Sequence, residues 1–430
     1  MKKAIALFVA MALLLALLSS CEMFVPDPTE RPSNWWNSAE PTGSAGPSPS
    51  EAVWQEGTGT DYDRRFSVYL TDNICATEDT VYFCEFMRGN MIYYADKATG
   101  ICLPLCGKPE CTHKDANCNA YVGSSGIECL SIYNGRLYWV GPEKVNNNWK
   151  DCIVSAAYDG RDRKVVRVLT DWWDAPSYGW SNMQVEFHRG YVYKYYVSDE
   201  VVDGVAKKIA YVKAYPIEED REAFVILSEE IEEIAPDHNS YNTARIQGYE
   251  EYVYIAIEET ADGAFELYRW DTRAGELETL YRGEAPFDWD REYLVMEDGV
   301  VFLGTEYADP DGDVEETVLY RFTFDTGEFE LLNRFRYNEG QSASVILSVG
   351  MVIANWRDTD SGSLRVLVNN FEGETVLDAT FEDVEWLISS SGIAGYGADE
   401  SYLYFFDYLR QFIAVPWDGS EIRLLWSKDT

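Results

Sequence analysis

The segment YVYIAIE, residues 252–258, decides the fold, because aromatic and β-branched side chains in this density are typical of a buried strand. It follows Glu250-Glu251, which stands where a tight hairpin turn is expected. Seven copies of such a segment indicate a repeated structural unit. The other six are TVYFCEF from Thr80, RLYWVG from Arg136, YVYKYYV from Tyr191, VVFLGTE from Val300, MVIANWR from Met351 and YLYFFDY from Tyr402.

The turns that precede these segments recur at a nearly constant interval. Consecutive turns lie 55, 55, 61, 48, 51 and 50 residues apart. A second hairpin follows each segment, as in YRWDTRAGELETLY and YRFTFDTGEFELLN, so each repeat is expected to form four short strands. One such sheet cannot bury both of its faces alone, which favours stacking of the units around an axis. We therefore predict an all-β fold, a β-propeller of seven four-stranded blades over residues 59–430. Six blades, eight blades or two sandwiches fit less well.

The N-terminal segment MKKAIALFVAMALLLALLSSC predicts export. Lys2 and Lys3 precede an apolar run that is too short for a spanning helix and ends in small residues. Leu18 to Cys21 resembles a lipobox, so residues 1–20 are expected to be a signal peptide and Cys21 to carry lipid. The Pro, Gly and Ser content of residues 21–58 predicts a flexible tether. The expected location is the outer side of the cell membrane; an ordinary secretory signal is the alternative.

The charge of the chain restricts its partners. It contains 35 basic and 74 acidic residues, for a formal net charge of −39. A field of this sign repels phosphate backbones and anionic headgroups, and it attracts cations. We therefore expect no nucleic-acid partner, a monomer, and a membrane association that depends on the lipid at Cys21.

These features together resemble one family, the TolB-like β-propeller lipoproteins of Gram-positive gut bacteria. The similarity lies in the lipobox, the Pro/Ser tether, repeats of the type YY..D..TG, and an insert CxKPxCxHxxxxCNAY that Cys106 to Tyr121 match. It covers nearly everything after Cys21. Six-bladed TolB differs from the seven repeats counted here. The resemblance implies a fold and a location and does not imply a reaction.

The insert CGKPECTHKDANC brings three cysteines and one histidine into thirteen residues. Cys106, Cys111, His113 and Cys118 could complete a closed tetrahedral zinc site, which would be structural because no position remains for water. Eight cysteines follow Cys21, however, and an even number outside the cytoplasm favours disulfides. Zinc, disulfides and free thiols all remain open from the sequence.

A second candidate metal site is the segment DPDGDVEE. Asp309, Asp311, Asp313 and Glu315 alternate with other residues, one of them glycine, as the oxygen ligands of calcium loops do. The order of the EF-hand loop is not met. A solvated hairpin loop in an acidic chain is the alternative.

Loop lengths indicate which face of the propeller binds ligands. If the strands of each blade are lettered A to D from the axis, the B–C and D–A connections share one face, here called the long-loop face. The cysteine insert, a D–A connection, is expected there. Tryptophans in polar loops on this face are candidate platforms for stacking on a glycan or peptide. They are Trp172, Trp173, Trp180, Trp289 and Trp356, and packing between blades is the alternative for each.

No sequence pattern supports nucleophilic catalysis. A G-x-S-x-G elbow is absent, and carboxylates are too abundant for spacing to single out a pair. The sequence therefore favours a lipid-anchored binding or scaffold protein. A glycan- or peptide-active hydrolase that uses carboxylates on the long-loop face is the alternative.

Overall fold

The computed structural model describes residues 73–84, 91–114, 116–122, 127–171, 185–202, 205–217, 221–231, 244–258, 264–307, 315–335, 344–348, 350–358, 363–381, 393–399, 401–407, 411–417 and 423–427. Contacts between Cα atoms divide the chain into two units, residues 1–44 with Thr430 and residues 45–429. All described residues lie in the second unit. No helix within the described ranges is long and apolar enough to cross a membrane.

The described residues form 28 strands in seven antiparallel sheets of four. Each sheet uses four consecutive strands, so the predicted seven-bladed β-propeller is confirmed. Blades 1 to 3 contain β1 (Ile74–Ala76), β2 (Thr80–Cys84), β3 (Ile92–Asp96), β4 (Cys102–Pro104); β5 (Glu128–Tyr133), β6 (Arg136–Val145), β7 (Asn148–Ala156), β8 (Lys164–Asp171); and β9 (Val185–His188), β10 (Tyr191–Val202), β11 (Val205–Pro216), β12 (Phe224–Ile231).

Blades 4 to 7 repeat the same order of strands. They contain β13 (Ala244–Tyr249), β14 (Tyr252–Ile257), β15 (Phe265–Asp271), β16 (Glu276–Gly283); β17 (Asp288–Val295), β18 (Gly299–Tyr307), β19 (Glu315–Thr323), β20 (Glu328–Phe335); β21 (Ser344–Ser348), β22 (Met351–Asp358), β23 (Ser363–Asn370), β24 (Thr375–Phe381); and β25 (Ile393–Ala398), β26 (Tyr402–Asp407), β27 (Gln411–Pro416), β28 (Arg423–Ser427).

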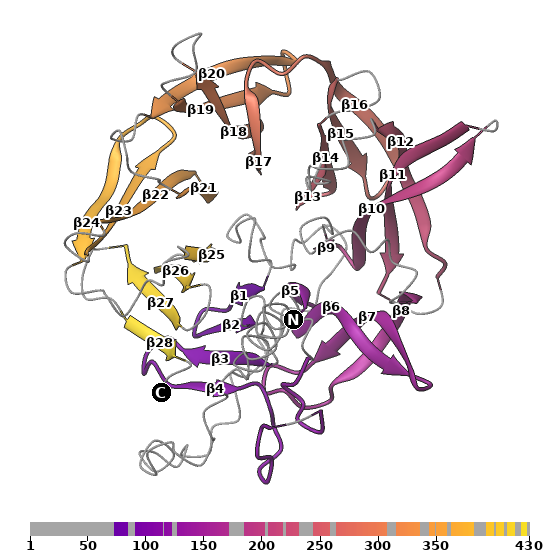
Figure 1. Cartoon of the computed structure of the whole chain (residues 1–430), viewed down its shortest axis with the longest axis vertical. Coiled ribbons are helices and arrows are strands. Elements are labelled where there is room, and N and C mark those ends of the chain that lie inside the picture. The colour runs from indigo at the N-terminus through magenta and orange to yellow at the C-terminus, as the bar shows by residue number, and fades with distance from the viewer. Residues whose placement is uncertain are drawn as a thin grey trace, which may run out of the picture. The chain divides into compact units, whose positions relative to one another are not determined.

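The first strand of each blade lies nearest the axis. Contacts link β1 to β5, β5 to β9, and so on around the ring to β25, which contacts β1 (Figure 1). The aromatic segments are the second strands, which is the B position when the strands are lettered from the axis outward. There they are sandwiched between neighbouring blades.

Two of the turns between A and B strands have the backbone of a type I′ hairpin turn. Asn134 and Gly135 join β5 to β6 with φ values of 46° and 71°. Positive φ at both central residues is the mark of a type I′ turn, whose twist matches that of the flanking strands. Arg189 and Gly190 repeat this conformation between β9 and β10.

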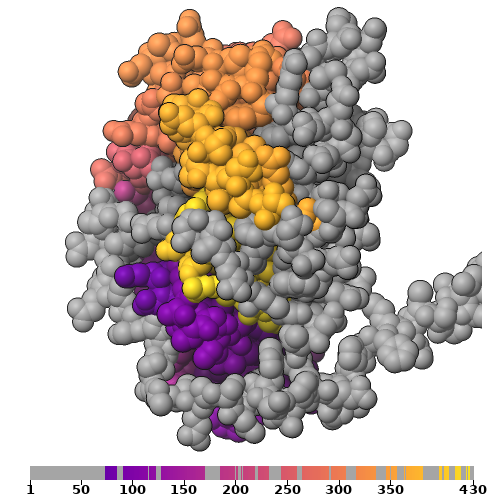
Figure 2. Space-filling model, turned by 90° about the vertical axis from the view of Figure 1, so that its left-hand side faces the viewer, coloured from indigo at the N-terminus to yellow at the C-terminus, as the bar shows by residue number. Residues whose placement is uncertain are grey.

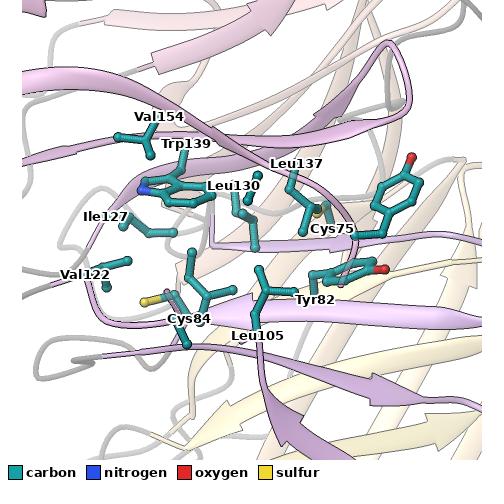
Figure 3. Close-up of a cluster of buried hydrophobic side chains, with 14 of the residues drawn as sticks. Cys75, Tyr82, Cys84, Leu105, Val122, Ile127, Leu130, Leu137, Trp139 and Val154 are labelled. Atoms are coloured by element: carbon teal, nitrogen blue, oxygen red, sulfur yellow. The ribbon is translucent and has the colours of Figure 1, made fainter. Parts of the chain in front are cut away.

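Burial of the second strands provides the core. Trp139 on β6 packs with Leu130, Leu105 and other apolar residues of blades 1 and 2 (Figure 3). Comparable clusters fill the other blade junctions. The largest fully buried side chains include several from second strands: Tyr82, Phe83, Trp139, Tyr193, Tyr195, Phe302, Tyr404 and Phe405.

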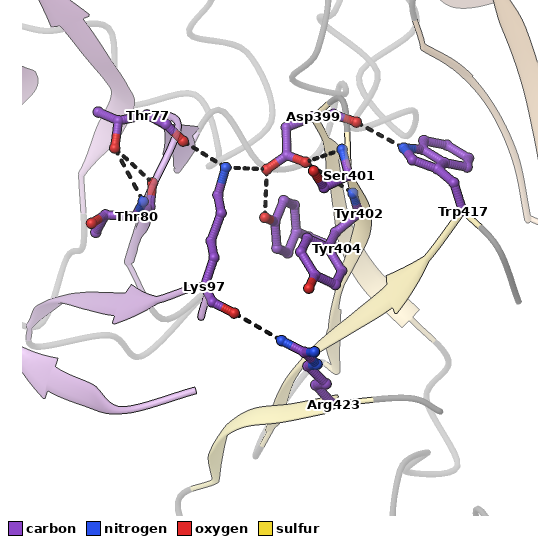
Figure 4. Close-up of polar contacts among 9 residues, drawn as sticks. All are labelled: Thr77, Thr80, Lys97, Asp399, Ser401, Tyr402, Tyr404, Trp417 and Arg423. Carbon is purple, nitrogen blue, oxygen red and sulfur yellow. Dashed lines mark hydrogen bonds and ion pairs between the residues drawn. The ribbon is translucent and has the colours of Figure 1, made fainter. Parts of the chain in front are cut away.

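Among the described residues, the ring closes by contact between blades 1 and 7, and each of the two sheets contains strands of its own blade alone. Phe83 and Phe412 stack with ring centroids 4.0 Å apart, and in Figure 2 the yellow last blade lies against the indigo first blade. Lys97 forms an ion pair of 2.6 Å with Asp399, and Arg423 donates to the Lys97 carbonyl at 2.8 Å (Figure 4). A segment that the sequence offers as an extra edge strand of blade 7, RFSVYL from Arg65, lies outside the described residues.

Candidate metal centre

The cysteine insert connects β4 of blade 1 to β5 of blade 2. Its two ends meet beside β3, because Leu105 donates to the Ile92 carbonyl at 2.8 Å and Ile92 donates to the Ala120 carbonyl at 2.9 Å. Asn119 then donates from its side chain to the Gly160 carbonyl at 2.7 Å. Gly160 belongs to the β7–β8 turn, which is a C–D turn and so lies at the end of blade 2 opposite the long-loop face.

This position corrects the expectation that the insert lies on the long-loop face. With only three residues, β4 spans about 10 Å, so the chain leaves blade 1 while it is still level with the β7–β8 turn. The insert therefore lies along the junction of blades 1 and 2.

A close backbone contact fixes the insert against blade 2. Gly160 has φ +75°, and a Cβ placed there would lie 2.3 Å from the carbonyl oxygen of Leu105. A larger residue would be strained in conformation and would also clash. Arg163 adds to this contact, since it donates to the carbonyls of Asn119, at 3.0 Å, and Tyr121, and it forms an ion pair with Glu143.

Four potential metal ligands converge within the insert. The sulfurs of Cys106, Cys111 and Cys118 and a ring nitrogen of His113 all lie within 4.8 Å of one another. His113 Nδ1 is 3.3 Å from Cys118 Sγ. Zinc with sulfur ligands at about 2.3 Å and nitrogen at about 2.0 Å keeps its ligand atoms about 3.5–3.8 Å apart. The described cysteines beyond Cys21 all carry free thiols. The cluster therefore has the donor set of a zinc site, and its ligand atoms exceed the spacing that zinc requires by at most about 1 Å.

The surroundings of the cluster favour metal binding. Burial lowers the pKa of His113, which leaves the ring neutral at pH 7. Burial by itself raises the pKa of Cys106, but N–H groups of Lys108 and Asn119 and the neighbouring thiols outweigh it, so this pKa is lowered. Burial and the proximity of Cys106 raise the pKa of Cys118 to about 12. Cys106 therefore loses its proton more easily than an unperturbed thiol, whereas Cys118 holds its proton more tightly and a bound cation would favour its loss.

The charge around the insert differs from that of the rest of the chain. Residues 101–171 contain nine basic and eight acidic residues, whereas residues 172–430 contain 19 basic and 53 acidic residues. Three thiolates in a strongly acidic region would be opposed by repulsion. The cluster lies in the part of the sequence where this repulsion is weakest.

Comparison with known proteins adds similarity of fold. No protein-family model and no curated protein matches the sequence. A prolyl endopeptidase structure is similar at 12% identity, with 85% of this chain and 51% of that chain covered and a TM-score of 0.46. The Pyrococcus horikoshii acylaminoacyl peptidase is similar at 13% identity, with 86% of this chain and 53% of that chain covered and a TM-score of 0.45. TolB from Acinetobacter baumannii is similar at 9% identity, with 75% of this chain and 64% of that chain covered and a TM-score of 0.33. The chain spans about half the length of the two peptidases.

Trp289 is not a stacking platform. It lies on β17, only 6% of it is exposed, and its Nε1 donates to the Glu292 carbonyl at 3.1 Å. Its ring packs edge-on against Phe265 at 5.4 Å. The prediction of a loop position rested on the polar residues beside Trp289 in the sequence, and it was wrong because Asp288 and Trp289 begin strand β17.

The other predicted site residues are only partly covered by the structure. Trp356 lies on β22 opposite Arg365, and Glu315 begins β19 opposite Tyr307, but neither side chain is described. The remaining predicted residues lie outside the described ranges: Cys21, Trp172, Trp173, Trp180, Asp309, Asp311 and Asp313. Calcium binding and ligand stacking at these positions stay predictions.

The long-loop face does carry exposed apolar side chains. Trp149, near the tip of the β6–β7 hairpin, is 44% exposed, and Val201 and Val205, at the tip of the β10–β11 hairpin, are 75% and 58% exposed. The strand bounds also leave longer connections on this side, such as 232–243 and 382–392, than between A and B strands. Both observations agree with a binding role for this face.

One buried ionic group was missed from the sequence. Lys194 on β10 forms ion pairs with Asp151 on β7 and, at 3.3 Å, with Glu128 on β5. Burial by itself lowers the pKa of Lys194, but the two carboxylates outweigh it and the pKa is raised. The available indication was a lysine inside the apolar segment YVYKYYV. Such a residue must have a charged partner if it is buried.

Proposed function

We propose that the protein binds one zinc ion at Cys106, Cys111, His113 and Cys118, and that this ion fixes the junction of blades 1 and 2. The convergence of the four ligand atoms within 4.8 Å carries the proposal. Sulfur and imidazole ligands favour zinc over calcium or magnesium. Four protein ligands fill a tetrahedral shell, so the role is structural. The ion would hold the insert against the β7–β8 turn and would take no part in a reaction.

Native mass spectrometry tests the metal directly. We expect one zinc ion per chain, lost on treatment with a chelator, and no zinc in Cys111→Ser. Cys102→Ser is the matched control, since Cys102 is a half-buried thiol close in sequence but outside the cluster, and it should retain the ion. A metal-free chain with fewer titratable thiols than the eight cysteines beyond Cys21 would instead support disulfides, and eight free thiols without metal would contradict both.

We further propose that the propeller is a lipid-anchored binding module on the outer side of the membrane, and that its long-loop face recognises a glycan or a peptide. The exposed indole of Trp149 supports this, because indole faces suit the CH faces of sugars and the side chains of peptides. The hydrolase alternative requires product formation that persists with chelator present and is lost on removing one carboxylate while binding remains.

Replacing Trp149 by Ala should weaken ligand binding about tenfold, the effect of losing about 1.4 kcal/mol of stacking. The measurement is a glycan and peptide array probed with the domain from residue 59 onward. Ile101→Ala is the control, because Ile101 is equally exposed, at 46%, but follows a C–D turn on the other face. Equal losses in both variants, or none in either, would argue against the long-loop face.

A further inference from the structure

The outer edge of β8 is free of a strand neighbour in the described part of the chain. β8 is the last strand of blade 2 and pairs only with β7. The N–H and C=O groups along such an edge can pair with another extended segment. Every blade has an edge of this kind, so the side chains must decide which edges are open to a partner.

β8 carries more basic than acidic residues, unlike the outer strands of blades 3 to 6. Lys164 and Arg167 are basic, and the only acidic residue of β8 is Asp171 at its end. The outer strands of three other blades carry two acidic residues each and at most one basic residue, Arg282 on β16 and Arg334 on β20, and this charge discourages pairing with an acidic segment. The acidic residues are Glu229 and Glu230 on β12, Glu276 and Glu278 on β16, and Glu328 and Glu330 on β20.

Exposed apolar residues accompany the basic ones. Val165 and Val168 on β8 are 36% and 43% exposed, and Phe224 and Val225 at the start of β12 are 38% and 48% exposed. Arg167 donates to the carbonyl of Arg221 at 2.5 Å, which ties β8 to the segment that leads into β12. We call Lys164, Val165, Val168, Phe224 and Val225 the rim patch. Apolar side chains beside a basic group fit an extended segment that alternates acidic and apolar residues.

We propose that the rim patch binds an acidic, extended peptide segment of a partner protein, which adds to blade 2 as a fifth strand. Main-chain hydrogen bonds to β8 would supply affinity, and a carboxylate facing Lys164 would supply specificity. The net charge of −39 does not prevent this, because charges more than about 8 Å away are screened at physiological salt.

The test uses two fluorescent eight-residue peptides, one alternating Glu with Val and one alternating Lys with Val. We expect the Glu peptide alone to bind the full chain, with affinity that falls as salt rises. Lys164→Glu should weaken its binding at least tenfold at an unchanged melting temperature. Val376→Glu is the matched control, because Val376 is 51% exposed on the outer strand β24 of blade 6, and it should leave binding unchanged.

Three results would overturn the proposal. One is no binding of the Glu peptide up to about 1 mM, a concentration that detects interactions as weak as about −4 kcal/mol. Another is equal binding of both peptides, or equal loss in Lys164→Glu and Val376→Glu. The third is self-association without peptide that Lys164→Glu abolishes, because it would assign the edge to a second copy. None of these results depends on zinc or on the long-loop face.

Discussion

Chelation of zinc should lower the melting temperature of the wild-type protein by several degrees, and Cys111→Ser should lower it to the same value without chelator. An ion that binds only the folded state stabilises it by about 4 kcal/mol when free zinc is about 1000 times its dissociation constant. The insert connects blades 1 and 2 and carries the bonds to Gly160, so its loosening weakens that junction. Differential scanning calorimetry with defined free zinc provides the measurement.

The decisive comparison is the effect of chelator on each variant. In Cys111→Ser the chelator should cause no further change, because the site is already lost. In Cys102→Ser it should act as in the wild type. A decrease of the same size in all three proteins would place the effect of the chelator elsewhere and contradict a zinc site at the insert.

Lys194→Met should destabilise the protein by about 3–5 kcal/mol, the usual cost of leaving one member of a buried ion pair without its partner. The Lys194 side chain is 7% exposed and that of Asp151 is 1% exposed, so water cannot replace the lost ammonium. The pair joins blades 2 and 3, and denaturant unfolding followed by tryptophan fluorescence reports the loss.

Lys207→Met is the matched control within blade 3. Lys207 also pairs with a glutamate, Glu230 at 2.5 Å, but the two side chains are 29% and 43% exposed. Exposed pairs contribute about 1 kcal/mol or less. Removing both charges in Lys194→Met with Asp151→Leu should recover part of the lost stability. Similar losses from Lys194→Met and Lys207→Met would show that burial of the pair is unimportant.

The sequence predicted the propeller because its information is local. Each aromatic segment, each turn such as Asn134-Gly135 and each repeat length can be read without knowing any distant contact. The seven repeats gave the correct number of blades. The place of each aromatic segment as the second strand of its blade could be predicted as well, because the tight turn before it and the hairpin after it lie within one repeat.

The site was less predictable, because several of its features depend on contacts between residues that are distant in the sequence. The spacing of Cys106, Cys111, His113 and Cys118 lies within one loop, so their convergence could be expected from sequence. The prediction that Trp289 is exposed was wrong because its burial depends on Phe265 of the preceding blade. Lys194 and its partners come from different blades, and no spacing in the sequence relates residues 128, 151 and 194.

The closure between blades 1 and 7 has a consequence for the order of the chain. Since every blade is built from four consecutive strands, the chain passes from each blade to the next only once, and blades 1 and 7 contain the first and the last described strands, β1 and β28. At the junction of blades 7 and 1, the stacking of Phe83 on Phe412 and the ion pair Lys97–Asp399 hold the two blades together by non-covalent contacts. The formation of the seven sheets therefore does not depend on which junction between blades contains the two ends of the chain. A circular permutant that joins residue 427 to residue 73 and begins at blade 5 preserves every sheet.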